Sequence, residues 1–135
     1  MTFNQLLRKE RSKKKNKTKT PRLESCPQKR GICEKVFTVA PKKPNSAVRK
    51  VVRVWLPSTL TKTHAYIPGI GHKLQKFSTV LIRGGRTRDL PGMYYKVIRG
   101  KYDAKPVWLR RRSISKYGVR NYYMFKKKKR WKQKI

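Results

Sequence analysis

Few residues of this 135-residue chain could carry out acid–base, nucleophilic or metal chemistry. Its histidines are His64 and His72, its cysteines are Cys26 and Cys33, and no two of its acidic residues are spaced as a general acid–base pair. The spacer between the cysteines is not a usual spacing for a zinc knuckle. We therefore predict no enzymatic activity, no cofactor and no bound metal. The cysteines are predicted to be two ordinary thiols, and a local disulfide is the alternative.

Two loop segments instead carry residue types suited to binding RNA. In residues 41–47 two prolines restrict the backbone around Lys42 and Lys43, and Asn45 and Ser46 follow. A stiff loop of this kind could present hydrogen-bonding groups to an RNA minor groove, where the 2′-hydroxyls lie. A plain turn between strands is the alternative.

The second segment is residues 83–92, which is rich in glycine and arginine. Gly84 and Gly85 let the backbone approach phosphates closely, and the arginines supply forked hydrogen-bond donors. Asp89 lies among these arginines, and we predict that it orients one of them.

The charge of the chain indicates the kind of partner it needs. Lys and Arg number 39 against 5 Asp and Glu, which gives a formal net charge of +34. Such a charge destabilises an isolated globule by self-repulsion, so a polyanion is expected, with nucleic acid first and an anionic membrane second. No apolar run approaches the roughly 20 residues that span a bilayer, and no secretory signal is recognisable. We therefore predict RNA partners and no membrane.

The elements that position these loops divide the chain into three predicted regions: an N-terminal extension (1–25), a β domain (26–100) and a C-terminal tail (101–135). A short helix is predicted over residues 2–7, because Thr2 and Gln5 have capping-box spacing. The basic stretch after it should be disordered alone and thread into RNA, with a solvated linker as the alternative. Its cations are Arg8, Lys9, Arg11, Lys13, Lys14, Lys15, Lys17 and Lys19.

The middle region predicts a mainly β fold. Strands are expected over 36–39, 48–56, 65–67, 77–83 and 93–99, separated by Gly, Pro and Asn. Five short strands suggest a small barrel of the oligonucleotide-binding (OB) type, although the pattern fits an SH3-like barrel almost as well. The tail alternates aromatic rings with cations, a common RNA-binding composition, and a non-specifically adhesive terminus is the alternative. The tail cations predicted to contact RNA are Arg120, Lys126, Lys127, Lys128, Lys129 and Arg130.

Seven short motifs give the chain a close resemblance to the small-subunit ribosomal protein twelve family. They are CPQKRGIC (26–33), PKKPNSA (41–47), RKV (49–51), YIPGIGH (66–72), LIRGGR (81–86), DLPG (89–92) and SKYG (115–118). The resemblance implies an OB-type barrel with an arm threaded into the small subunit. Its implied partners are small-subunit ribosomal RNA, neighbouring ribosomal proteins, the codon–anticodon helix and, transiently, elongation factors.

The resemblance also implies residue roles. His72 would face elongation factors. Arg88 stands where bacterial members carry a lysine that helps to hold streptomycin, so we predict reduced streptomycin sensitivity, which normal drug-induced misreading would contradict. The residues expected to contact decoding-centre RNA are Lys42, Lys43, Pro44, Asn45, Ser46, Arg83, Gly84, Gly85, Arg86, Arg88, Asp89 and Pro91.

The predicted location is the mitochondrial ribosome, with a plastid or a bacterium as alternatives. The motifs are of bacterial type, the chain is rich in Lys and Tyr, and the match begins too early for a transit peptide to be expected. Two other functions compete with the ribosomal one. A free cold-shock-type RNA chaperone would carry aromatic residues on its barrel strands, and a cationic membrane-active protein would need an amphipathic basic helix.

Overall fold

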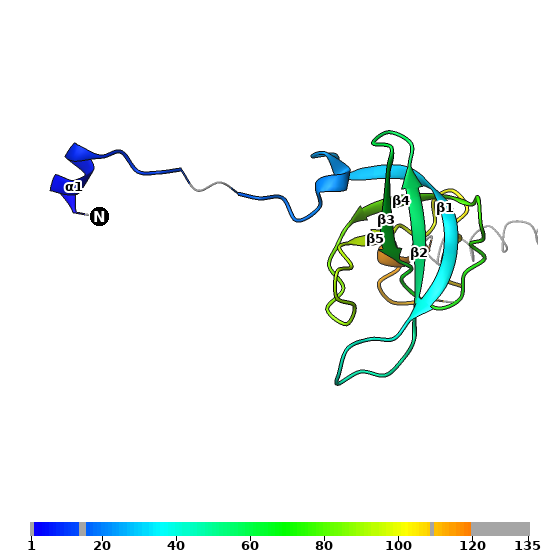
Figure 1. Cartoon of the computed structure of the whole chain (residues 1–135). Helices are drawn as coiled ribbons and strands as arrows, with labels where there is room; N and C mark the ends of the chain where they lie inside the picture. The colour runs from blue at the N-terminus through cyan, green and yellow to red at the C-terminus, as the bar shows by residue number, and fades with distance from the viewer. Residues whose placement is uncertain (1, 14–15, 109, 120–135) are drawn as a thin grey trace, which may run out of the picture.

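The fold is a small β-barrel with a long N-terminal arm (Figure 1). The computed structural model describes residues 2–13, 16–108 and 110–119. The elements in chain order are α1 (Phe3–Arg8), the 3-10 turn η1 (Pro21–Leu23), β1 (Gln28–Val39), β2 (Arg49–Leu56), β3 (Thr61–Tyr66), β4 (Thr79–Gly84), β5 (Tyr95–Val97) and the 3-10 turn η2 (Ser115–Tyr117).

The five strands close into a barrel in the order β1-β2-β3-β5-β4. All neighbours are antiparallel except β3 and β5, which are parallel. Strand β1 closes the barrel because its first half pairs with β4 and its second half with β2, and the register shifts between Cys33 and Lys35. This arrangement confirms the predicted mainly β, OB-type fold.

Two predicted strands were too short. Strand β1 begins at Gln28 rather than at residue 36. Its early inward-facing positions are Lys29, Gly31 and Cys33, and none of these is a large apolar residue typical of a strand. A side chain at Gly31 would collide with Val54, because its Cβ would lie against Val54 Cγ1. Strand β3 likewise begins at Thr61 rather than at residue 65, and its polar first half is defined by pairing with β2.

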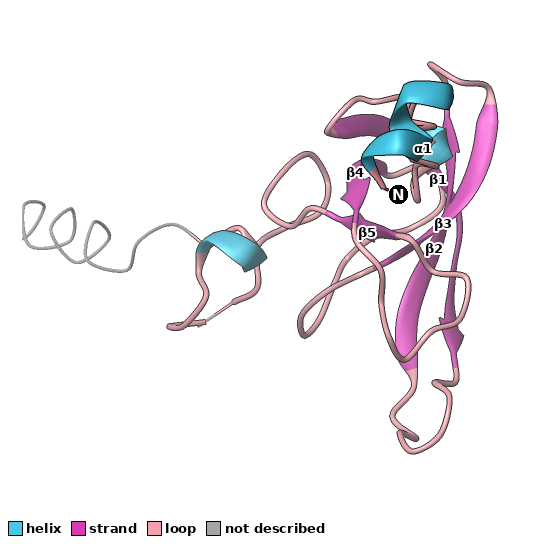
Figure 2. Ribbon diagram, turned by 90° about the vertical axis from the view of Figure 1, so that its left-hand side faces the viewer, coloured by secondary structure: helices cyan, strands magenta, loops and turns pink. Residues whose placement is uncertain are grey.

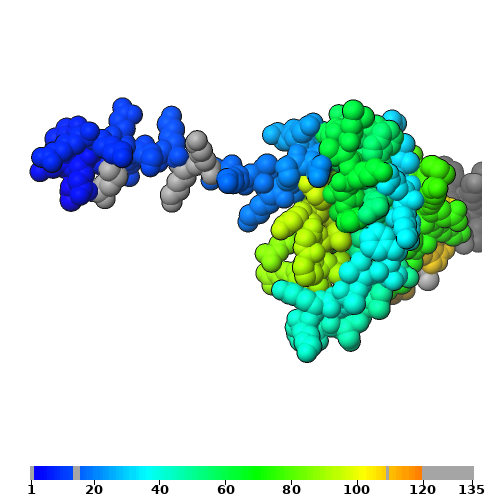
Figure 3. Space-filling model, viewed as in Figure 1, coloured from blue at the N-terminus to red at the C-terminus, as the bar shows by residue number. Residues whose placement is uncertain are grey.

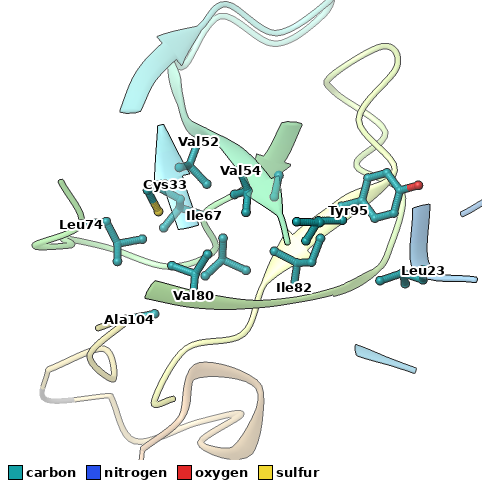
Figure 4. Packing of buried hydrophobic residues seen from close by; sticks show 13 residues of the cluster. Leu23, Cys33, Val52, Val54, Ile67, Leu74, Val80, Ile82, Tyr95 and Ala104 are labelled. Carbon is teal, nitrogen blue, oxygen red and sulfur yellow. The ribbon is translucent and has the colours of Figure 1, made fainter. Parts of the chain in front are cut away.

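The barrel interior is filled by one apolar cluster, shown in Figure 4. The predicted inward face of β2 is confirmed, since Val52, Val54 and Leu56 are fully buried. Leu23 and Ala104, from outside the predicted bounds of the barrel domain, also enter this cluster. Those bounds remain a prediction.

Helix α1 lies apart from the barrel, at the far end of the arm (Figure 1). The predicted capping box is present: the Thr2 backbone N–H donates to Gln5 Oε1 at 3.0 Å. Phe3 and Leu7 are largely exposed, so their apolar surface is open to a partner. Among the helices of the described residues, none is long and apolar enough to cross a membrane.

Candidate nucleic-acid interface

The loop between β4 and β5, here called the arginine loop (residues 85–94), is fixed to the outside of the barrel by a second apolar cluster. Leu90 and Met93 are buried against Val51, with partly buried Phe37 and Tyr66 beside them. Val51 is therefore covered on the face of β2 that points away from the barrel interior. This apolar contact determines where the polar residues of the loop are held.

Asp89 joins the arginine loop to the loop between β1 and β2, here called the proline loop (residues 40–48). The Lys42 backbone N–H donates to the Asp89 backbone oxygen at 2.9 Å, and Asn45 Nδ2 donates to Asp89 Oδ1 at 2.9 Å. The other carboxylate oxygen, Oδ2, lies 2.9 Å from Arg49 Nη2. Asp89 thus pairs with an arginine, as predicted, but this arginine is Arg49, at the start of β2, and not one of those around Asp89 in the sequence.

The two loops extend from the same side of the barrel, as Figures 2 and 3 show. In the proline loop Lys42, Lys43, Pro44, Asn45 and Ser46 are all exposed. In the arginine loop Arg86, Arg88 and Pro91 are exposed, while Gly85 and Asp89 are partly buried. Arg83 and Gly84, at the end of β4, are also partly buried.

A hollow of about 460 Å³ lies between the arginine loop, the proline loop and the root of the arm, where the arm joins the barrel. Its charged lining residues are all cations: Lys19, Lys42, Arg86 and Arg88. A concave surface with this lining favours a polyanion such as a nucleic-acid backbone.

Lys19 reaches the hollow because the root of the arm is fixed to the barrel. Leu23 is buried in the core, and the Arg22 backbone N–H donates to the Tyr95 hydroxyl at 3.1 Å. Thr20 packs closely on Gly84. The sequence predicted the charge of the arm but not this attachment, since Leu23 was not recognised as a core residue.

A second group of cations lies on β4 and β5. Arg83 stands directly opposite Lys96 in the antiparallel pair of these strands. Like charges opposite each other in a sheet are destabilising. The pKa of Lys96 is lowered, first by burial and then by Arg83 and Lys116. A bound anion would relieve this repulsion.

The other predicted RNA contacts belong to the arm and the tail. The arm cations in the described residues, Arg8, Lys9, Arg11, Lys13, Lys17 and Lys19, are all exposed. Lys14 and Lys15 lie outside the described residues, and so do the tail residues Arg120, Lys126, Lys127, Lys128, Lys129 and Arg130.

His72 belongs to the loop between β3 and β4 (residues 67–78). Figure 1 shows this loop, in green, on the other side of the barrel from the arginine loop. Its pKa is lowered by burial, and then by Arg99 and Lys50. Within residues 2–13, 16–108 and 110–119, His72 Nδ1 is buried and has no hydrogen-bond partner. Nothing in this arrangement tests the predicted contact with elongation factors.

Arg99 holds the His72 loop in place, a role that the sequence did not predict. Its guanidinium is almost completely buried, with 4% of the residue exposed. Nη1 donates to Pro68 O at 2.8 Å, Nη2 to Gly71 O at 2.8 Å and Nε to Lys105 O at 2.7 Å. One side chain thus ties the His72 loop and the segment after β5 together.

The two cysteines are free thiols in the structure. Cys33 is fully buried, and burial, with a further contribution from Asp103, raises its pKa to about 11. Cys26 is exposed. In the part of the chain that the structure describes, no group of three or more His, Cys, Asp or Glu residues is placed to hold a metal ion.

Comparison with known proteins gives one family match that covers most of the chain. The model of a family described as ribosomal protein S12/S23 matches residues 16–133. The matched range contains the root of the arm, both loops and the whole barrel.

Proposed function

Because this chain belongs to the ribosomal protein S12/S23 family, whose members are structural proteins of the small ribosomal subunit, we propose that it supports the decoding centre of that subunit. In this proposal it binds small-subunit ribosomal RNA and contributes to translational accuracy. It performs no bond chemistry.

The observation that carries the proposal is the junction at Asp89. Asp89 receives hydrogen bonds from Lys42 and Asn45 and pairs with Arg49. The proline loop and the arginine loop therefore form one surface, here called the joined loops. This surface leaves Lys43, Pro44 and Ser46 exposed at its tip. A contact surface that is already ordered loses less conformational entropy on binding than two separate loops would.

The proposed mechanism is selection by shape. Correct pairing of codon and anticodon gives a minor groove of fixed geometry, in which bases of the ribosomal RNA dock. The joined loops contact these docked bases and stabilise them. A mismatch changes the groove, so packing and hydrogen bonds are lost together and discrimination increases.

Other residues have supporting roles in this proposal. The arm cations thread into ribosomal RNA, the tail cations and rings contact RNA, and neighbouring ribosomal proteins cover part of the surface. The codon–anticodon helix of mRNA and tRNA is met at the joined loops, and His72 faces elongation factors transiently. The bacterial-type motifs and the Lys- and Tyr-rich composition support the mitochondrial ribosome as the location, and a plastid or bacterial ribosome is the alternative.

Sedimentation tests the assignment to the particle. Lysate is run on sucrose gradients at low and high salt, and the chain is detected in each fraction. We expect it to remain with the small subunit even at high salt, because a threaded arm cannot leave a folded RNA easily. A chain that runs free, or leaves at modest salt, would instead favour a free RNA chaperone.

Misreading assays test the role of the joined loops. Ribosomes carrying Arg86→Ala and Arg88→Ala should show altered near-cognate reading, because two cations that line the hollow are lost. The matched control is Lys35→Ala with Arg53→Ala, which removes equal charge from exposed positions paired across β1 and β2. Equal changes in both double variants would show that net charge, and not the joined loops, affects accuracy.

A further inference from the structure

Two exposed aromatic residues outside the two loops of the proposed decoding surface each have a lysine ammonium over the ring. Phe77 is 74% exposed, and Lys76 Nζ lies 4.9 Å from its ring centroid. Tyr102 is 49% exposed, and Lys101 Nζ lies 5.3 Å from its ring centroid. Each site therefore repeats the same pattern, a lysine followed directly by an exposed aromatic ring.

Both rings are presented by turns in which the aromatic residue has left-handed backbone. The φ angle is 67° at Phe77 and 50° at Tyr102, a conformation that is unusual for bulky residues. Each turn is anchored to the barrel. The Phe77 backbone N–H donates to Cys33 O at 2.7 Å, and the Tyr102 turn is closed by a bridge between Lys101 and Ala104.

The two turns are bound to each other through Asp103 and Thr79. The Thr79 backbone N–H donates to Asp103 Oδ2 at 2.6 Å, and the Asp103 backbone N–H donates to Thr79 O at 3.2 Å. Ala104, which follows in the second turn, is buried in the core beside Val80, as Figure 4 shows. The two segments that carry the aromatic residues are therefore held next to each other.

We propose that Phe77 and Tyr102 form a stacking site for unpaired bases of RNA, with Lys76 and Lys101 pairing with the adjacent phosphates. Each ring has a lysine ammonium over one face, which leaves the opposite face for a base. This arrangement suits a nucleotide, since the base stacks on the ring while its phosphate meets the ammonium. The surroundings are cationic, because Lys76, Lys101 and Lys105 outnumber Asp103, whose carboxylate already accepts from Thr79. An RNA is therefore favoured over an apolar segment of another protein.

This site lies outside the two loops to which the decoding role is assigned, so it adds a second kind of RNA contact. The joined loops are suited to a paired helix and its backbone, whereas the stacking site requires bases that are not paired. The two contacts can be tested separately, because the stacking site can lose its rings without any change in charge.

The test measures binding of the purified full chain to a single-stranded octauridylate and to a duplex RNA of the same length, by fluorescence anisotropy at several salt concentrations. Stacking contributes about 1–3 kcal/mol per base. Phe77→Leu with Tyr102→Leu should thus weaken octauridylate binding about tenfold or more, with an unchanged salt dependence, because no charge is removed. Duplex binding should change less than twofold. Ultraviolet irradiation of the wild-type complex should cross-link uridine to Phe77 or Tyr102, as mass spectrometry of the peptides would show.

Leu60→Ala is the matched control, because Leu60 is exposed (79%) and has left-handed backbone (φ 49°) like the two aromatic residues, but has no ring and lies between two threonines in the sequence. Phe77→Tyr should retain binding, since it keeps a ring. Equal affinity of the double leucine variant and the wild type, with cross-links elsewhere, would overturn the proposal. The proposal would also be overturned if the Phe77→Ser variant lost its association with the small subunit while the Phe77→Leu variant kept it. That pattern would indicate an apolar contact with a protein. If the arginine-loop variants bound duplex RNA as tightly as the wild type, that outcome would count against the decoding surface alone. The result for the stacking site would stand.

Discussion

At the scale of single residues, the buried arginine matters more to this fold than most of the exposed cations. Arg99 satisfies three backbone carbonyls from two separate segments, at Pro68, Gly71 and Lys105. A planar guanidinium can donate in three directions at once, whereas a lysine ammonium is a compact point charge that cannot span the same distances. Arg99 is therefore a positioning residue for the loop that carries His72.

Replacement of Arg99 should destabilise the protein. We expect Arg99→Met to lower the free energy of unfolding by about 2–4 kcal/mol, because three charge-assisted hydrogen bonds of the buried guanidinium are lost. Arg99→Lys should recover only part of the loss. Urea denaturation monitored by circular dichroism measures the change, with Arg53→Met on the exposed face of β2 as the control. A change below about 0.5 kcal/mol at Arg99, the usual size for a surface site, would contradict this role.

The two histidines make stability depend on pH with a defined sign. Burial lowers the pKa of both, and Arg53 beside His64 and Arg99 and Lys50 beside His72 lower it further. The unfolded chain therefore binds protons more readily than the folded chain, so folding stability rises with pH. The histidine contribution is fully present above their ordinary pKa of 6.5 and is lost as pH falls towards the lower folded pKa values.

Thermal melts between pH 5.5 and 7.5 should thus show a lower melting temperature at the acid end. The change His64→Gln with His72→Gln should flatten this dependence, because the neutral amide does not titrate. A wild-type profile that is flat, or that rises towards acid pH, would show that the histidines are not held in the neutral form.

At the scale of elements, strands with buried apolar residues could be predicted and strands with buried polar or small residues could not. The alternation of Val52, Val54 and Leu56 identified β2 within one residue of its bounds. The first half of β1 was missed because its inward positions hold Lys29, Gly31 and Cys33. Lys29 tolerates its burial through a pair with Glu24, in which Nζ lies 2.6 Å from Oε2. Such a pair depends on tertiary structure that local periodicity cannot reveal.

The same limit applies to the candidate site. Both loops could be recognised by composition, since prolines, glycines and arginines act locally. Their connection could not, because Asp89 contacts Asn45 and Arg49 across 44 and 40 positions of sequence. Nor could Val51 be identified as the point where the arginine loop packs, since it lies on the face of β2 that alternation assigns to solvent.

The arginine loop should therefore loosen when its apolar anchor is removed. Leu90 is 2% exposed, and Leu90→Ala is expected to cost about 2 kcal/mol, the low end for buried leucines, because the cluster is small. The loss should extend to RNA binding, since Leu90 follows Asp89 directly. Leu60→Ala, at an exposed turn, is the control for both measurements. A stable Leu90→Ala variant with normal duplex affinity would show that the loop is held by Asp89 alone.

At the scale of the whole molecule, a net charge of +34 governs how salt acts on the chain. In the free protein, like charges repel one another over the barrel surface. Some of them, such as Arg83 and Lys96, are cations that face each other across two neighbouring strands. Added salt screens this repulsion and should stabilise the fold. With RNA bound, the phosphates already neutralise the cations, and binding itself stabilises the folded state. Salt then weakens binding by reducing the gain from counterion release.

The sign of the salt effect should consequently reverse when RNA is added. Between about 50 and 500 mM KCl, where the screening length falls from roughly 14 to 4 Å, the melting temperature of the free chain should rise. In the presence of excess duplex RNA it should begin higher and fall over the same range, until the two curves converge. Differential scanning fluorimetry with and without RNA measures both curves, and potassium glutamate in place of chloride separates screening from specific anion binding. Two curves that rise together would mean that RNA does not neutralise the charges that destabilise the free barrel, and the chain would then need a protein partner to account for its charge.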